Sequence, residues 1–184
     1  MKVTPMRLPG LIRFEPRVFS DERGSFFEGW NAARYRDAGI HDDFVQDNIA
    51  SSVYGVLRGL HLQRPHGQGK LVSVLSGSVF DVAADVRHGS PTFGQWIGVE
   101  LSDRNRVQLY LPPGFAHGYQ VTSPSAVFCY KVTDYYDPGA ELVITPHDPA
   151  IGIRWPIAPP ILSPRDMNGL LLTDIRSDRL PVFG

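Results

Sequence analysis

Hydrophobic and polar residues alternate in short runs along the middle of this chain. Alternation with a period of two is typical of β-strands. Turn residues separate five such runs, at 70–75, 79–86, 97–101, 107–111 and 126–133. In the last run Phe128, Tyr130 and Val132 share one face. The pattern therefore predicts an all-β protein of mostly antiparallel strands, arranged as a sandwich or as a jelly roll that closes on itself.

Only two segments favour helix. Asn31 can accept a backbone hydrogen bond at the start of a helix over 31–39, and Gly39 can end it. A further helical turn is expected within 166–172, and the chain from about residue 157 is expected to be irregular with short helices. No linker, repeat or low-complexity block is visible, so we expect residues 1–184 to form one domain.

The balance of charge narrows the possible partners. The formal net charge is −1, from 18 basic and 19 acidic residues. This argues against a nucleic-acid or membrane surface that depends on bulk charge, but it allows a local phosphate-binding cluster. No apolar run approaches the ~20 residues that a membrane span needs. The first residues lack the apolar core of a signal peptide, so we expect a cytoplasmic protein.

Cys129 is the only cysteine, which excludes an intrachain disulfide and a cysteine-rich zinc site. Its neighbours Val127, Phe128 and Tyr130 are apolar or aromatic. We therefore expect a buried apolar thiol, with a catalytic thiol as the alternative.

Two histidine motifs are the first candidate chemistry. Residues 55–77 have nearly the spacing of the first cupin fingerprint, and residues 112–117 have that of the second. Metal-binding cupins have a histidine where this chain has Gln63, and a glutamate where it has Lys70. Gln63 is a poor metal ligand, and the charge of Lys70 opposes a cation. We therefore expect a cupin-type double-stranded β-helix with no metal, in which Lys70 stabilises an oxyanion.

Alternatives to this use of the motifs remain. Lys70 is also consistent with a surface lysine on an edge strand. His61, His66 and His117 together offer three imidazoles to a metal, although Lys70 would oppose the ion.

Nine segments together resemble the dTDP-4-keto-6-deoxyglucose 3,5-epimerases, which act in the dTDP-L-rhamnose synthesis that supplies cell-envelope polysaccharides. They run in order from about residue 5 to 170: DERGSFFE (21–28), FVQDN (44–48), GVLRGLHLQ (55–63), QGKLV (68–72), GSPTFGQW (89–96), PPGFAHGY (112–119), YKVTDYY (130–136), DPAIGIRWP (148–156) and LSPRD (162–166). The resemblance implies an isomerase without a cofactor. This enzyme inverts C3 and C5 of dTDP-4-dehydro-6-deoxy-D-glucose, gives dTDP-4-dehydro-L-rhamnose and acts as a homodimer.

The resemblance also implies roles for four residues. A ketone at C4 makes the protons at C3 and C5 acidic, so the reaction needs a base, an enolate stabiliser and an acid on the opposite face. His61 is then the base and Asp166 orients it. Lys70 stabilises the enolate oxygen, and Tyr130 returns a proton from the other face. We further expect Lys70 to lie near Tyr130 and to lower its pKa.

Without the resemblance these residues have plainer interpretations. His61 is consistent with a core histidine, Asp166 with a loop or helix-cap aspartate, and Tyr130 with a core aromatic.

Ten further residues are implied as substrate contacts: Arg23, Phe26, Glu28, Gln46, Asn48, Arg58, His117, Tyr136, Glu141 and Arg165. Arg23 and Arg58 are expected at the diphosphate, because a guanidinium binds phosphate oxygens bidentately. In the family the N-terminal strands come from the other subunit, so a dimer would complete the site. A surface hairpin explains 21–28 equally well. Tyr135 and Tyr136 exchange roles if the register differs.

Departures from the family leave the substrate open. The loop between His61 and Lys70 is one residue shorter and contains His66, and Thr-Pro-His at 145–147 replaces a common Trp-Asn. One alternative is an enzyme that inverts only C3 or only C5 of a related dTDP, GDP or CDP sugar. Others are a metal-dependent cupin oxygenase or isomerase and a non-catalytic sugar-binding jelly roll.

Overall fold

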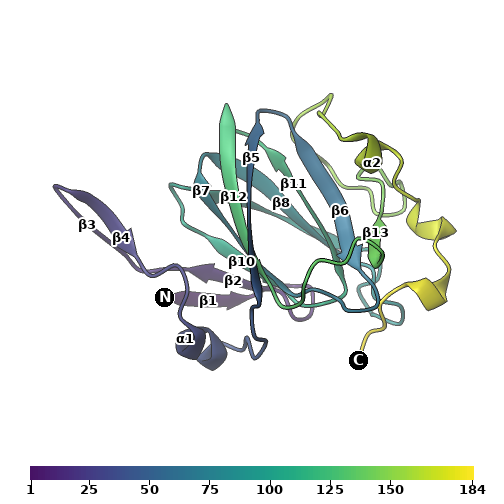
Figure 1. Ribbon diagram of the computed structural model, residues 1–184, viewed down its shortest axis with the longest axis horizontal. Helices are drawn as coiled ribbons and strands as arrows, with labels where there is room; N and C mark the ends of the chain where they lie inside the picture. Colours follow the sequence, from purple (N-terminus) through teal and green to yellow (C-terminus); the bar gives the residue numbers. More distant parts are fainter.

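The structure is a computed structural model that describes all 184 residues, and its two main sheets enclose a common interior (Figure 1). One sheet has six strands, in the order β1 (Lys2–Pro5), β2 (Ile12–Glu15), β10 (Gln108–Leu111), β7 (Lys70–Ser76), β12 (Ser125–Val132) and β5 (Gln46–Val53). The other has five, in the order β13 (Glu141–Val143), β6 (Leu57–Gln63), β11 (Phe115–Val121), β8 (Ser78–Asp85) and β9 (Trp96–Ser102). Neighbouring strands are antiparallel, so the predicted jelly roll is confirmed.

A separate hairpin of β3 (Val18–Asp21) and β4 (Gly24–Phe27) extends from the body at the left of Figure 1. Its strands pair with each other and with neither main sheet. Beyond β13 the chain has only short helices: α2 (Pro164–Met167) and 3-10 turns at Leu172–Asp174 and Ser177–Arg179.

Helix α1 (Ala32–Asp37) forms where the sequence predicts it. The Asn31 side chain accepts from the Arg34 backbone at 3.2 Å, and Gly39 follows the helix with a φ of +102°. Helix α2 begins earlier than expected. Ser163 caps it and Pro164 occupies its first turn, both favoured there, so Asp166 lies inside the helix rather than at its start.

The barrel interior is lined by alternate residues of β7, β8, β11 and β12, which form the main hydrophobic core. A second core lies between the outer face of the five-stranded sheet and the C-terminal segment. Strand β8 is therefore buried on both faces. Asp81 and Asp85, the polar positions of its alternation, point inward and are fully buried.

The expected burial of Cys129 is only partly met. Phe128 is fully buried and Tyr130 packs against the main core, so Cys129 between them faces outward. The thiol is partly exposed there and lines a shallow groove on the six-stranded sheet.

Strands β6 and β11 approach closely at Gly59. A Cβ at this position would lie 2.6 Å from the Gly118 Cα and 2.8 Å from the His117 carbonyl oxygen, and the φ of Gly59 is +130°. Only glycine allows both the conformation and the approach. Because His61 and His117 face each other two residues further along, this approach also sets the geometry of the site.

We predict that Gly59→Ala destabilises the fold more than Gly24→Ala does. Gly24 has a similar φ of +126°, but a Cβ there would meet nothing within 4 Å. Any additional loss at Gly59 therefore reports the steric clash, expected at about 1–3 kcal/mol. Urea unfolding of the two variants measures the difference. Equal losses would show that β6 and β11 separate at little cost.

Candidate active site

A cavity of ≈ 280 Å³ lies between β5 and β12 of one sheet and β6 of the other. Its lining brings together eight residues singled out from the sequence: Gln46, Asn48, His61, Gln63, Lys70, Tyr130, Tyr136 and Glu141. Leu62 and Gln68 complete it. Polar and ionisable groups are therefore concentrated at the wall of an apolar core, although the net charge of the chain is close to zero.

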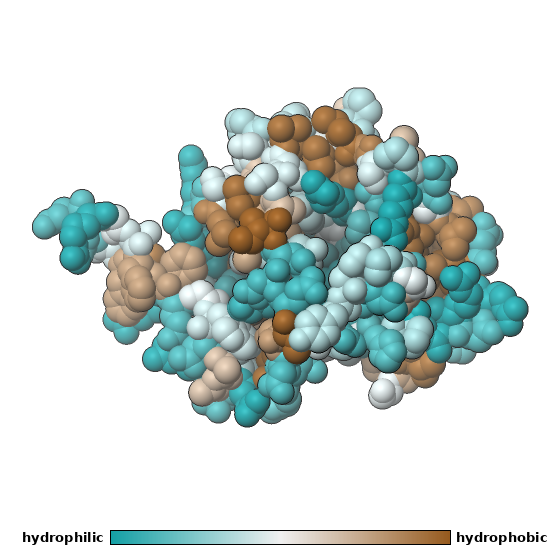
Figure 2. Space-filling view, viewed as in Figure 1, coloured by the Kyte–Doolittle hydropathy of each residue, from teal (hydrophilic) through white to brown (hydrophobic).

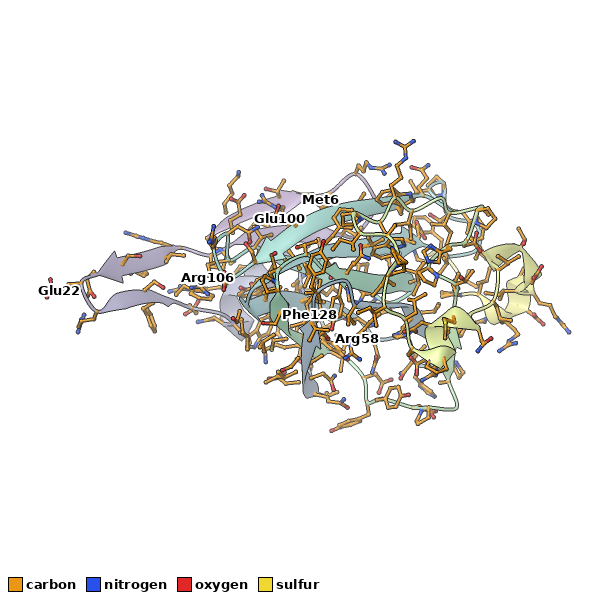
Figure 3. All side chains as sticks on the ribbon, turned by 90° about the horizontal axis from the view of Figure 1, so that it is seen from above. Met6, Glu22, Arg58, Glu100, Arg106 and Phe128 are labelled. Carbon is orange, nitrogen blue, oxygen red and sulfur yellow. The ribbon has the colours of Figure 1, made fainter.

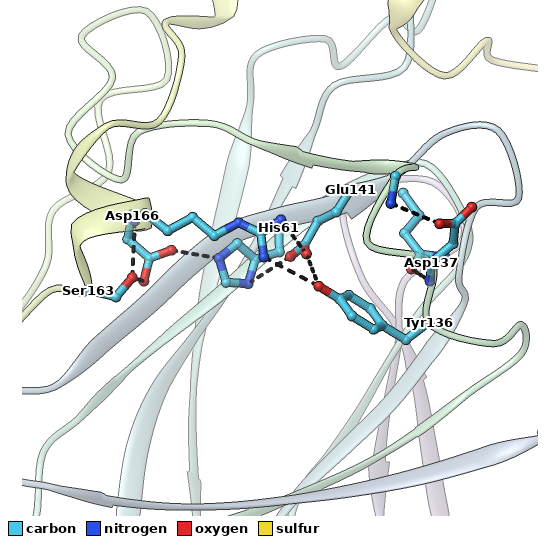
Figure 4. A network of polar contacts seen from close by, with 9 residues as sticks. His61, Tyr136, Asp137, Glu141, Ser163 and Asp166 are labelled. Atoms are coloured by element: carbon cyan, nitrogen blue, oxygen red, sulfur yellow. Dashed lines mark hydrogen bonds and ion pairs between the residues drawn. The ribbon is translucent and has the colours of Figure 1, made fainter.

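Strand β6 presents His61 to Asp166 of helix α2, as Figure 4 shows. The distance from His61 Nε2 to Asp166 Oδ1 is 2.6 Å. A carboxylate only accepts, so Nε2–H donates and the Nδ1 lone pair remains free. Ser163 Oγ donates to Asp166 Oδ2 at 2.8 Å. Burial alone would raise the pKa of Asp166, but the bonds from His61 and Ser163 outweigh it and hold that pKa below its ordinary value.

Glu141 lies on the other side of His61. Its Oε1 is 3.8 Å from His61 Nδ1, and its Oε2 accepts from Tyr136 at 2.7 Å and from Arg165 at 2.6 Å. These contacts fix the carboxylate and share its charge with Arg165. The ring of His61 therefore lies between two carboxylates, with Asp166 at Nε2 and Glu141 near Nδ1.

Lys70 is the first residue of β7, and only 8% of it is exposed, so the alternative of a surface lysine is wrong. Its Nζ makes no hydrogen bond or ion pair in the structure. Burial lowers the pKa of Lys70 to about 8, although Glu141 and then Asp81 pull it upward. The ammonium is thus available to a negatively charged atom in the cavity.

Directly across from His61 in the register of β6 and β11 stands His117, which is buried. Its Nε2 donates to Asp81 Oδ2 at 2.8 Å. Burial lowers the pKa of His117 despite the opposing charge of Asp81, so this imidazole stays neutral near pH 7.

Tyr130 lines the same cavity as Lys70, but the expected lowering of its pKa is wrong. Burial raises the pKa of the phenol, and Tyr119 and Glu141 raise it further against a weaker effect of Arg58. The low polarity of the barrel wall disfavours the phenolate more than nearby cations favour it. Tyr130 therefore keeps its proton.

Three predicted substrate contacts lie away from the cavity. Arg23 pairs with Asp21 near the tip of the hairpin, which Figure 3 marks by Glu22 at its far end. Phe26 is 71% exposed on the same hairpin. Glu28 bonds Arg34 and Asn31 at the start of α1.

Two more residues sit at the margin. Arg58 is exposed and donates to Ser52, close enough to affect Tyr119 and Tyr130 electrostatically. Tyr136 lines the cavity, whereas Tyr135 is 67% exposed, so the register favours Tyr136.

His66 does not join His61 and His117 in a cluster that could hold a metal ion. His66 is exposed and 3.8 Å from Asp134, apart from His61 and His117. The Gln63 amide donates to the carbonyls of His66 and Tyr135 and accepts from the Asp137 backbone. Gln63 thus braces the loop that presents Tyr136.

Two further features of the sequence point to the site. Asp81 and Asp85 alternate with Val79 and Ala83 on the inner face of β8, which marks charges with buried partners. Ser163-Pro164 before Asp166 is a helix start that orders the carboxylate.

We predict that Ser163→Ala weakens the fold at neutral pH by about 1 kcal/mol, because α2 loses its cap and Asp166 loses a donor. The pKa of Asp166 is lowered in the folded state, so its contribution is complete above the ordinary value of 3.8 and disappears as pH falls through the folded value. The variant raises the folded pKa and shrinks this acid-sensitive part. Urea unfolding at pH 7 and below pH 4 measures both effects.

Asn31→Ala is the matched control for this experiment, since it removes the cap of α1 far from Asp166. It should cost a similar free energy without changing the dependence on acid pH. If the acid dependence is unchanged in Ser163→Ala as well, the Ser163 hydroxyl does not help to lower the pKa of Asp166.

Comparison with known proteins gives consistent matches. Residues 5–174 match the family model described as dTDP-4-dehydrorhamnose 3,5-epimerase. A protein of that name from Pseudomonas aeruginosa is 50% identical over 176 residues, which cover 95% of this chain and 97% of the relative. A dTDP-4-dehydrorhamnose 3-epimerase from Streptomyces niveus is 40% identical over 186 residues, covering 100% of this chain and 90% of the relative.

Among solved structures, the dTDP-6-deoxy-D-glucose-3,5-epimerase from Legionella pneumophila, in complex with dTDP-4-keto-L-rhamnose, superposes with a TM-score of 0.96. It is 50% identical, and the match covers 100% of this chain and 98% of that one. The longest helices here fall well short of the length and apolarity needed to cross a bilayer.

Proposed function

Because the chain belongs to the dTDP-4-dehydrorhamnose 3,5-epimerase family, we propose that its cavity inverts C3 and C5 of dTDP-4-dehydro-6-deoxy-D-glucose. The protein is a carbohydrate epimerase, and the product is dTDP-4-dehydro-L-rhamnose. The observation that carries the residue assignment is the His61–Asp166 pair at 2.6 Å, in one cavity with Lys70 and Tyr130.

The base in this proposal is His61. Asp166 holds Nε2–H, so the free Nδ1 takes the proton from carbon next to the C4 ketone. The C–H electron pair moves toward the carbonyl and an enolate forms. Asp166 and Glu141 stabilise the resulting imidazolium from its two sides.

Lys70 stabilises the enolate oxygen. Its ammonium makes no direct hydrogen bond to a side chain, and a positive charge acts more strongly in a cavity of low polarity than in water. With a pKa of about 8, Lys70 is mostly charged at neutral pH.

Tyr130 completes the inversion. It stands on β12 of the six-stranded sheet, whereas His61 stands on β6 of the five-stranded sheet. A proton removed from one wall and returned from the other inverts the carbon. The phenol of Tyr130 forms the new C–H bond, and both His61 and the phenolate then exchange protons with water before the next carbon reacts.

Inversion of C3 alone is the second candidate function, since the relative from Streptomyces niveus is named a 3-epimerase. The relatives near 50% identity are named 3,5-epimerases, which favours the double reaction. Incubation with dTDP-4-dehydro-6-deoxy-D-glucose in deuterated water, followed by NMR, counts the carbons that exchange. Deuterium at C3 alone would establish the single epimerase.

We predict that His61→Ala lowers deuterium incorporation at both C3 and C5 by about 10²–10⁴-fold, because both carbons depend on the same base. The wild-type reaction in the same NMR assay sets the reference rate. Exchange at the normal rate would remove His61 from the mechanism.

Tyr130→Phe should give a different result. The variant keeps the base and the enolate stabiliser, so we expect slowed protonation at C5 while some exchange at C3 persists. Normal exchange at both carbons would show that another group is the acid.

The isolated hairpin supports a homodimer in which each hairpin reaches the partner's cavity. Phe19 and Phe26 are more than half exposed on it, and Figure 2 shows hydrophobic residues gathered near its root. An exposed apolar hairpin that pairs with neither sheet is typical of a segment that another chain covers. Arg23 would then bind the diphosphate of the neighbouring site, whose other arginine is Arg58.

Mixing two defective variants tests this arrangement. Arg23→Ala should raise KM with a smaller effect on kcat, and His61→Ala should be inactive. In a mixed dimer, one site would combine an intact His61 with an intact Arg23 from the other chain. Random exchange of subunits should therefore restore about a quarter of wild-type activity at low substrate. No gain over Arg23→Ala alone would mean that the hairpin serves its own chain.

A further inference from the structure

Asp81 is a buried charge that the epimerisation steps do not use. It is 0% exposed, on the inner face of β8. Its Oδ2 accepts from His117, but its Oδ1 has no hydrogen-bond partner. A fully buried carboxylate oxygen without a donor is costly, so its presence calls for a compensating positive charge.

Lys70 is the complementary group. Its side chain is buried, faces the same interior and makes no hydrogen bond or ion pair of its own. The other nearby carboxylates are already engaged. Asp166 is held by His61 and Ser163, and Glu141 is held by Arg165 and Tyr136.

We propose that Asp81 is the internal counterion of Lys70, and thereby a positioning residue that keeps the ammonium charged for the enolate while it fixes the orientation of His117. The Asp81 carboxylate then contacts groups from two other strands. Its Oδ2 accepts from His117 on β11, and its Oδ1 balances the charge of Lys70 on β7. The catalytic consequence rests on the proposed role of Lys70, whereas the pairing itself does not.

The surrounding charges are consistent with this pairing. Titratable groups on several elements surround Lys70: Glu141 and Asp81 act on its charge, Lys70 acts on His117, and His61, Tyr130 and Tyr136 line the same cavity. Burial is the largest influence on the pKa of Lys70 and lowers it to about 8. The charge of Glu141 and then that of Asp81 raise the pKa of Lys70 against this effect, and Arg165 offsets the charge of Glu141. Loss of Asp81 would therefore lower the charged fraction of Lys70 near pH 7.

A titration of Lys70 by NMR tests the pairing without any substrate. The chain contains three lysines, Lys2, Lys70 and Lys131, so lysine labelled with 13C at Cε gives a spectrum simple enough to assign with Lys70→Met. In the full-length protein, Asp81→Asn should lower the midpoint of the Lys70 titration by about one pH unit. An unchanged midpoint in folded Asp81→Asn overturns the proposal.

Asp85→Asn is the matched control. Asp85 is also fully buried on the inner face of β8, but its carboxylate is bound by Arg87, Ser90 and Thr92. This variant should lower the thermal stability and leave the Lys70 midpoint in place. A shift equal to that of Asp81→Asn would mean that any disturbance of β8 moves the titration.

If Asp81→Asn does not fold, a second variant still tests the pairing. If the two charges balance each other, Asp81→Asn combined with Lys70→Met removes both and should be destabilised less than the two single changes added together. Thermal unfolding measures this coupling. Additive losses, or a double variant that stays unfolded when Lys70→Met alone folds, overturn the pairing.

The pH profile of kcat/KM separates the pairing from catalysis. Its alkaline limb should move to lower pH in Asp81→Asn by the same amount as the NMR midpoint. If Lys70→Met keeps wild-type activity, the proposed role of Lys70 in the reaction fails while the titration still judges the pairing. If Lys70→Met is inactive and the titration of Asp81→Asn is unchanged, only the counterion is wrong.

Discussion

Ionisable groups buried in a β-barrel must balance one another, because the interior offers them little water. This constraint organises the site of this protein. Asp166 pairs with His61 and Glu141 with Arg165, whereas the ammonium of Lys70 makes no direct hydrogen bond and has Asp81 as its proposed counterion. An ammonium whose N–H groups are free is what an enolate oxygen needs, so the cavity is prepared for a negative charge.

The arrangement of the two sheets gives these charges their directions. Antiparallel strands with inward alternation bring His61 to one wall of the cavity and Tyr130 to the opposite wall. Burial acts in opposite directions on the pKa values of Tyr130 and Lys70. It keeps Tyr130 protonated and lowers the pKa of Lys70 to about 8. The proposed acid Tyr130, base His61 and cation Lys70 therefore coexist in one cavity near neutral pH.

The five-stranded sheet and the C-terminal segment together hold the base in place. The inner face of the sheet contributes to the barrel core through β8, β9 and β11, and its outer face, with Leu60 and Leu62 of β6, packs under the C-terminal segment. The same C-terminal segment supplies α2, whose cap at Ser163 holds the carboxylate that orients the base. The β3–β4 hairpin pairs with neither main sheet, which is consistent with a segment whose contacts lie on another chain.

The sequence by itself determined five strands (β7, β8, β9, β10 and β12), the α1 cap at Asn31 and the family, since alternation, capping residues and motif spacing are local properties. It also singled out His61, Lys70 and Tyr130, through their places in those motifs. Tertiary structure decided what depends on surroundings. Burial raised the pKa of Tyr130 against the expectation, and exposure on an outward face made Cys129 a groove residue. The partners of buried charges come from distant strands, so no local pattern could reveal which carboxylate faces which cation.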